Sequence, residues 1–120
     1  MTPPPGVQAF FAAMNARDAA RLGELLADDA VFHFPKTAPL EGATRILRFF
    51  KVLWRGYPRL DFSIRSAIED PAAARAAVHW TNAGETREGE PYANEGVTLL
   101  AWADGRFTWI SDFFKDTERF

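Results

Sequence analysis

The chain has 120 residues, 48% of them hydrophobic and 25% charged, which is typical of a globular domain rather than of a disordered chain. Its formal net charge of −2 argues against nucleic-acid binding, because that function needs a basic surface to neutralise phosphates. The absence of cysteine excludes disulfides, thiolate catalysis and cysteine-based zinc or iron–sulfur sites.

The expected location is the cytoplasm. No apolar run approaches the roughly 18 residues that a membrane-spanning helix requires. The first six residues, M-T-P-P-P-G, have neither a basic segment nor an apolar stretch, so they do not resemble a signal peptide. Residues 1–6 are instead expected to be a mobile tail, and no membrane contact is expected.

Two helices are predicted at the start of the chain. From Val7 to Met14 the apolar residues recur every three or four positions, which indicates an amphipathic helix. Asp18 can then cap a second, shorter helix. The apolar residues of that second helix are Leu22, Leu25 and Leu26, and Asp28-Asp29 ends it.

A strand and a longer helix come next. Residues 30–35 (A-V-F-H-F-P) indicate a short strand closed by proline, and residues 39–42 a turn. The helix that follows has an apolar and a basic face and ends at Gly56 and Pro58. Its apolar residues are Ile46, Leu47, Phe50, Leu53 and Trp54, and its basic residues are Arg45, Arg48, Lys51 and Arg55.

The second half of the chain indicates four strands joined by turns. Residues 60–65 alternate apolar and polar side chains, as a half-buried strand does. Asp104-Gly105 is the strongest short hairpin signal in the chain. The remaining predicted strands span residues 74–83, 93–103 and 106–114, with a polar connection at 84–92 and a C-terminal tail at 115–120.

This order of elements predicts an α+β fold. The three helices of the N-terminal half must cover one face of a curved sheet, mixed or antiparallel, because nothing else in the chain can cover it. Eleven Phe and four Trp exceed what so small a core can hide. The surplus aromatic residues are therefore expected to line a cavity or a partner surface.

Three segments carry a family resemblance: D-D-A-V-F-H-F at 28–34, E-G at 41–42 and D-G-R-F-T-W-I-S-D-F-F at 104–114. With the element order, they make the chain resemble the nuclear transport factor 2-like superfamily, and within it the SnoaL-like branch. That branch includes polyketide cyclases and limonene epoxide hydrolase, with ketosteroid isomerase a more distant relative. The resemblance implies one SnoaL-like domain over residues 1–120, a cone-shaped cystatin-like α+β barrel, a pocket for a small apolar molecule, and a homodimer.

Asp112 is the candidate catalytic residue. Epoxide-hydrolase-like relatives carry an Asp followed by two aromatic residues on the last strand, and Asp112-Phe113-Phe114 matches. SnoaL-like cyclases use an Asp near this place as general base, so the resemblance implies that role for Asp112. If Asp112 faces the pocket, desolvation raises its pKa toward neutrality. The alternative is a solvated or arginine-paired Asp at the end of a strand.

Other residues of these relatives have no counterpart in this chain. The Tyr and Asn that help hold water in the epoxide hydrolases correspond to Phe32 and Phe34. Their Arg–Asp pair corresponds to Trp80 with Asn82, or to His79 with Thr81. The base of ketosteroid isomerase falls at Phe34 and its protonated acid at Thr98, and the first helix lacks the isomerase's Tyr.

Strand alternation selects the remaining candidates. Trp80 and Asn82 share one face, where the Asn82 amide can orient a carbonyl or a water, unless Trp80 is core and Asn82 begins a turn. His33 and His79 are expected to point outward, and no metal-ligand spacing and no cofactor site is found. The predicted pocket residues are Phe32, Phe34, Trp54, Trp80, Asn82, Thr98 and Ile110.

The opposite face of the last strand carries an aromatic row, Phe107, Trp109 and Phe113. We expect this row to be a homodimer interface, because water penalises a contiguous exposed apolar patch. The alternative is that the parity is inverted, so that the row forms the core and Asp112 is exposed.

The expected function is proton abstraction next to a carbonyl by an isomerase or cyclase, with Asp112 as base and Asn82 or Thr98 as candidate carbonyl partners. One alternative is a protein that binds a hydrophobic ligand, or dimerises, without catalysis. A weaker alternative is water activation of the epoxide-hydrolase type. A shared fold does not choose among these chemistries.

Overall fold

The computed structural model describes residues 3–118. The helices are α1 (Val7–Ala16), α2 (Ala19–Leu25) and α3 (Ala43–Gly56). The strands are β1 (Leu26–His33), β2 (Leu40–Glu41), β3 (Arg59–Asp70), β4 (Arg75–Glu85), β5 (Pro91–Ala103) and β6 (Arg106–Phe114). Among the described residues, no helix is both long and apolar enough to cross a lipid bilayer.

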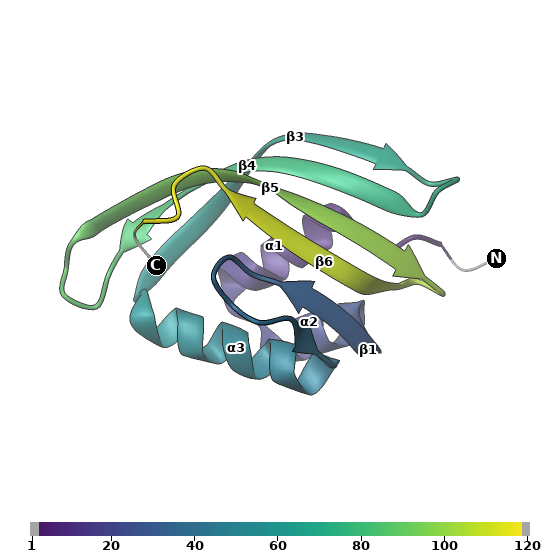
Figure 1. The fold of residues 1–120 in the computed structure, drawn as a ribbon, viewed down its shortest axis with the longest axis horizontal. Coiled ribbons are helices and arrows are strands. Elements are labelled where there is room, and N and C mark those ends of the chain that lie inside the picture. The colour runs from purple at the N-terminus through teal and green to yellow at the C-terminus, as the bar shows by residue number, and fades with distance from the viewer. Residues whose placement is uncertain (1–2, 119–120) are drawn as a thin grey trace.

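The strands form one mixed sheet in the order β2-β1-β6-β5-β4-β3. β1 runs parallel to β6, whereas all other neighbouring pairs are antiparallel. Figure 1 shows that the sheet curves without closing and that the helices lie on its concave side. The predicted α+β fold, with helices covering one face of a curved sheet, is confirmed.

β1 differs most from its prediction. It begins at Leu26, which the leucine spacing had placed on the second helix, and it includes the two Asp residues expected to end that helix. Asp28 and Asp29 are exposed, and they lie where the pairing with β6 shifts register between Leu26 and Val31. The irregular pairing lets two charged residues face water in a strand whose Leu26, Ala30 and Phe32 are buried in the core.

The turn between β5 and β6 follows the sequence, but the strand after it does not keep simple alternation. Asp104 and Gly105 have φ values of 53° and 78° and connect Ala103 to its partner Arg106, as a tight hairpin requires. A register shift then leaves an extra residue in β6 between Phe107 and Trp109. This bulge turns Phe107 inward.

The placement of Phe107 in the outer aromatic row is therefore wrong. Phe107 is fully buried, and its ring lies 5.6 Å from that of Phe10 on α1. Trp109 and Phe113 remain outside the core, and Phe113 is 56% exposed. The expected parity holds from Trp109 onward, which leaves Asp112 on the inner face.

The segment after β6 is attached to β5 rather than extending away from it. The Lys115 amide donates to the Glu95 carbonyl (2.8 Å), and the Asn94 side-chain amide donates to the Asp116 carbonyl (2.7 Å). At the other end, Pro5 is buried just before α1. Of the two predicted tails, residues 1–2 and 119–120 lie outside the described part of the chain.

Gly96 allows a large aromatic side chain to lie across the middle of the sheet. Trp80 on β4 is completely buried beside Gly96 on β5. A Cβ atom at position 96 would come within 2.6 Å of Trp80 Cζ2 and 2.4 Å of the Phe113 carbonyl oxygen. Real Cβ atoms do not approach so closely, so any other residue would displace both the Trp80 indole and β6.

Gly96→Ala should therefore lower the free energy of unfolding by roughly 1–3 kcal/mol or more, as overpacked cores do. Gly56→Ala, at the end of α3 where an added Cβ meets nothing within 4 Å, should leave stability unchanged or raise it. Urea denaturation of both variants measures the difference. Equal stabilities would show that the sheet adjusts without strain.

Candidate functional site

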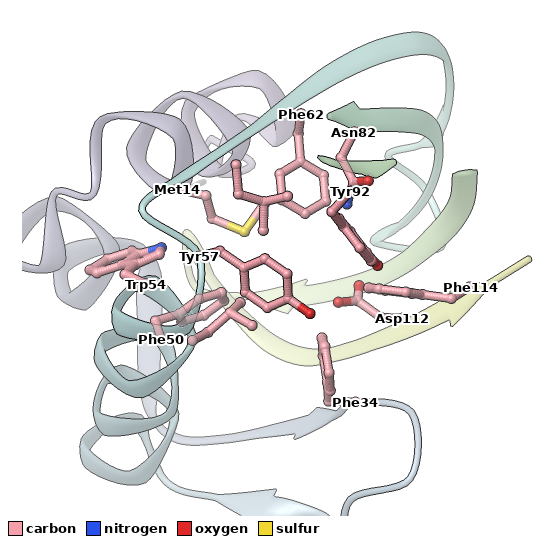
Figure 2. A pocket seen from close by; sticks show the side chains of 12 residues that line it. Met14, Phe34, Phe50, Trp54, Tyr57, Phe62, Asn82, Tyr92, Asp112 and Phe114 are labelled. Atoms are coloured by element: carbon pink, nitrogen blue, oxygen red, sulfur yellow. The ribbon is translucent and has the colours of Figure 1, made fainter. Parts of the chain in front are cut away.

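A cavity lies between the C-terminal end of α3 and the concave face of β3 to β6 (Figure 2). Its volume of about 20 Å³ has room for one or a few water molecules. Most of the lining is aromatic or aliphatic, so a carboxyl group in this wall is poorly solvated. The lining residues are Met14, Phe34, Phe50, Leu53, Trp54, Tyr57, Leu60, Phe62, Asn82, Tyr92, Asp112 and Phe114.

The polar groups of this wall come from four places in the chain. Asn82 lies on β4, Tyr92 on β5 and Asp112 on β6, while Tyr57 directly follows α3. The two Tyr rings are in contact, with centroids 5.1 Å apart. Figure 2 shows the Asp112 carboxyl pointing toward the hydroxyl ends of both Tyr side chains. The cavity is thus an apolar space with its polar groups gathered on one side.

Burial raises the pKa of Asp112 from 3.8 to about 7, and a hydrogen bond from Thr98 opposes the rise. The hydroxyl of Thr98 donates to Asp112 Oδ1 at 2.6 Å. Within residues 3–118, no cationic side chain lies within ion-pair distance of this carboxyl group. Asp112 is therefore a carboxyl group that gains and loses its proton near neutral pH.

The direction of the bond to Asp112 is fixed by a third residue. The Trp80 indole N–H donates to Thr98 Oγ1 at 2.8 Å, and an indole nitrogen can only donate. Thr98 must therefore accept from Trp80 and give its one hydroxyl proton to Asp112 Oδ1. The two hydrogen bonds join Trp80 on β4, Thr98 on β5 and Asp112 on β6. They lie beside Gly96, whose missing side chain leaves room for the Trp80 indole.

This arrangement divides the two oxygens of Asp112 between two roles. Oδ1 is occupied by the Thr98 hydroxyl. Oδ2 forms no hydrogen bond with another residue of the described part of the chain. Asp112 also lines a surface hollow with His33, Pro35 and Thr37, so it lies between the cavity and the protein surface.

The structure places four of the eight predicted site residues on the cavity wall: Phe34, Trp54, Asn82 and Asp112. The other four, Phe32, Trp80, Thr98 and Ile110, are buried in the core and do not line the cavity. The Phe32 ring stacks on Phe50, with centroids 5.5 Å apart. Trp80 and Thr98 reach the site through their hydrogen bonds to one another and to Asp112.

Eight further residues line the cavity but were not predicted from the sequence: Met14, Phe50, Leu53, Tyr57, Leu60, Phe62, Tyr92 and Phe114. Phe114 shares a face with Asp112 by simple alternation, so that signal was available. Tyr92 was assigned to the 84–92 connection, whereas it is a buried residue of β5. Extending the alternation of β5 by two residues would have placed it inside.

Both histidines lie on the outer side of the sheet. His79 Nε2 is 2.6 Å from Glu95 Oε2, and this hydrogen bond, together with Lys115, lowers the pKa of Glu95. The His33 ring contacts Trp109. No group of three metal-ligating side chains occurs among residues 3–118.

The raised pKa of Asp112 predicts a pH-dependent stability. Below about pH 4 the Asp112 carboxyl is protonated in both the folded and the unfolded chain, so it does not change the free energy of unfolding. Between about pH 4 and 7 it ionises only in the unfolded chain, so the free energy of unfolding falls as the pH rises. The shift in pKa sets an upper limit of about 4 kcal/mol on this loss of unfolding free energy. The actual loss should be smaller, because the Asp112 side chain is partly accessible to water. Asp112→Asn should therefore gain stability over the wild type as pH rises.

Urea denaturation of wild type and Asp112→Asn at about pH 4 and about pH 8 measures this gain. Asp29→Asn, at an exposed position of β1, is the matched control and should follow the wild type. Parallel pH profiles for Asp112→Asn and wild type would contradict the raised pKa.

Comparison with known proteins places this geometry in a family. Residues 7–110 match the SnoaL-like domain model. No protein among those with curated descriptions matches the chain. Similar solved structures include a proposed SnoaL-like polyketide cyclase from Jannaschia sp. CCS1, with TM-score 0.81, 21% identity, and coverage of 91% of this chain and 82% of that one.

A second structure is a proposed polyketide cyclase from Pseudomonas putida KT2440, with TM-score 0.82, 22% identity, and coverage of 89% of this chain and 86% of that one. A third is an LEH-like epoxide hydrolase from M. tuberculosis, with TM-score 0.78, 20% identity, and coverage of 91% of this chain and 79% of that one. At such identities the likeness shows a shared fold alone. The family model spans most of the chain, so this protein belongs to the SnoaL-like domain family.

Proposed function

We propose that the protein catalyses proton transfer next to a carbonyl group in a small, mainly apolar molecule, as an isomerase or cyclase does, with Asp112 as the base. The observation that carries the proposal is the Asp112 carboxyl, with a pKa of about 7 and Oδ1 fixed by Thr98, in an apolar cavity wall. A base with a pKa near the working pH is the most effective proton carrier.

The reaction can be written with the residues of the cavity alone. Ionised Asp112 takes a proton from the carbon next to the substrate carbonyl, and the electron pair of that C–H bond forms an enolate. In an isomerisation, Asp112 returns the proton to another carbon. In a ring closure, the enolate carbon attacks a second carbonyl and the new alkoxide takes the proton. Neither route changes the oxidation state of the whole molecule.

The cavity limits what can bind. A volume of about 20 Å³ is smaller than a substrate ring, so binding requires lining side chains to move. The mostly apolar lining supports a second candidate function, the binding of a hydrophobic ligand without turnover. Epoxide hydrolysis is less supported, since the inward pair on β4 is Trp80 and Asn82 in place of Arg and Asp.

Hydrogen–deuterium exchange separates catalysis from binding. Cyclohexanone in D₂O exchanges the hydrogens next to its carbonyl whenever a base removes them, and ¹H NMR follows the loss of signal. The wild type should accelerate exchange above the buffer rate, with the rate rising through about pH 7 and then levelling. Asp112→Asn should reduce the protein-dependent rate about tenfold or more, whereas Asp29→Asn should not.

Two outcomes would count against the proposal. Wild-type exchange no faster than buffer, with cyclohexanone bound, would favour a binding protein. Equal exchange in the wild type and Asp112→Asn would remove Asp112 as the base. Thr98→Val should shift the midpoint of the pH–rate profile upward, because the hydrogen bond that lowers the pKa of Asp112 is lost.

We also propose that the convex face of the sheet binds a second copy of the chain through Trp109 and Phe113. No helix covers this face in Figure 1. Phe113 pairs with Val97 on β5 and Trp109 with Ala101, which makes a mainly apolar strip across two strands, interrupted by Ser111 opposite Leu99. An identical strip on a second copy would complement it around a two-fold axis.

Phe113→Glu should convert the dimer to monomer in sedimentation experiments, because it places a charge in the apolar strip. Val52→Glu is the matched control, since Val52 is also 56% exposed but lies on α3, away from the strip. A dimer that persists in Phe113→Glu, or a monomeric wild type, would contradict this interface.

A further inference from the structure

Asn82 is a buried polar residue with an unfilled hydrogen-bonding capacity. It is 4% exposed, and its amide oxygen Oδ1 is sealed from solvent without a donor among the described residues. Its amide nitrogen Nδ2 also forms no hydrogen bond with another described residue, and unlike Oδ1 it is not sealed from solvent. Figure 2 shows the amide on the cavity side of β4, directed toward Tyr92.

Asn15, which is half-buried, shows what a structural asparagine looks like in this fold. Asn15 on α1 is fully used: its Nδ2 donates to the Phe62 carbonyl at 2.9 Å, and its Oδ1 accepts from the Phe62 amide at 2.8 Å. Asn15 thus joins α1 to β3. Asn82 joins nothing, so it lowers the stability of the fold that contains it. An apolar side chain of the same shape would pack there without that loss.

The structure also removes the competing carbonyl partner. Thr98 was the second candidate, but its one hydroxyl proton is committed to Asp112, because Trp80 can only donate to it. Thr98 is itself a core residue rather than a lining residue. Asn82 is left as the side-chain amide of the cavity wall that can meet a substrate oxygen.

We propose that the amide N–H of Asn82 donates to the carbonyl oxygen of the substrate, which defines the ligand class as small ketones. This inference rests on the proposed proton-transfer function and adds the group that receives the developing charge. When Asp112 removes the proton, negative charge gathers on the carbonyl oxygen. A donor already aimed at that oxygen stabilises the enolate without reorganising. Asn82 is then a catalytic residue that contacts the substrate.

The test uses Asn82→Leu, which keeps the branched shape of the side chain and removes its polarity. The unfolding temperature should rise by about 3–6 °C, because the substitution removes a buried polar group that has no hydrogen-bond partner. NMR titration with cyclohexanone and with methylenecyclohexane, its matched hydrocarbon, gives the preference for the ketone. That preference should fall about tenfold, and cyclohexanone exchange should slow by a similar factor.

Asn15→Leu is the matched control. The same chemical change at a fully bonded asparagine should lower the unfolding temperature and leave the ketone preference intact. The opposite signs of the two stability changes separate a functional asparagine from a structural one.

The outcomes distinguish this inference from the proposed function. Suppose that Asp112→Asn abolishes hydrogen–deuterium exchange while Asn82→Leu keeps both the exchange and the preference for the ketone. The proposed role of Asn82 is then overturned, whereas the role of Asp112 as base stands, and another group must bind the carbonyl oxygen. A lower unfolding temperature in Asn82→Leu would show a structural role and would also overturn the inference. Loss of ketone preference in Asn82→Leu, with exchange absent even in the wild type, would instead leave a ketone-binding protein.

Discussion

The site depends on the hydrogen bond between Thr98 and Asp112, and that bond depends on Gly96, two residues before Thr98 on β5. Without a Cβ at Gly96, the Trp80 indole lies across β5 and reaches Thr98 Oγ1. The indole can only donate, so it orients the Thr98 hydroxyl toward Asp112. Three neighbouring strands thereby hold Oδ1 of the carboxyl group, whereas Oδ2 forms no hydrogen bond with a described residue.

The surroundings of Asp112 decide its protonation. Helices on the concave face and the aromatic side chains of β3 to β6 remove water from the carboxyl, and burial raises its pKa more than the Thr98 hydrogen bond lowers it. No arginine or lysine of the described chain compensates its charge. The fold is therefore less stable with Asp112 ionised, and Asn82 adds a second unsatisfied polar group to the same wall. Both features oppose stability, which is the pattern that functional sites commonly show, and both support the proposed function.

The sequence predicted the features that follow from periodicity and turn chemistry: the helix faces, the Asp104-Gly105 hairpin and the inward parity of Asp112. It could not predict features set by strand pairing. The bulge in β6 returned Phe107 to the core, and pairing with β6 drew Leu26 into β1. Tyr57 and Tyr92, distant in sequence, meet in the cavity because α3 ends beside the start of β5. The hydrogen bonds of Trp80 and Thr98 could not be predicted from the sequence, because strand alternation shows only which face a side chain lies on.

The most direct test of this account is the pKa of Asp112 itself. A ¹³C NMR titration of the side-chain carboxyl carbon follows its ionisation without any ligand. The midpoint should be about 7 in the wild type and higher in Thr98→Val, because that variant loses the hydrogen bond that lowers the pKa. A midpoint near 4, the value of an ordinary aspartate, would show a solvated carboxyl group and would contradict both the buried base and the function built on it.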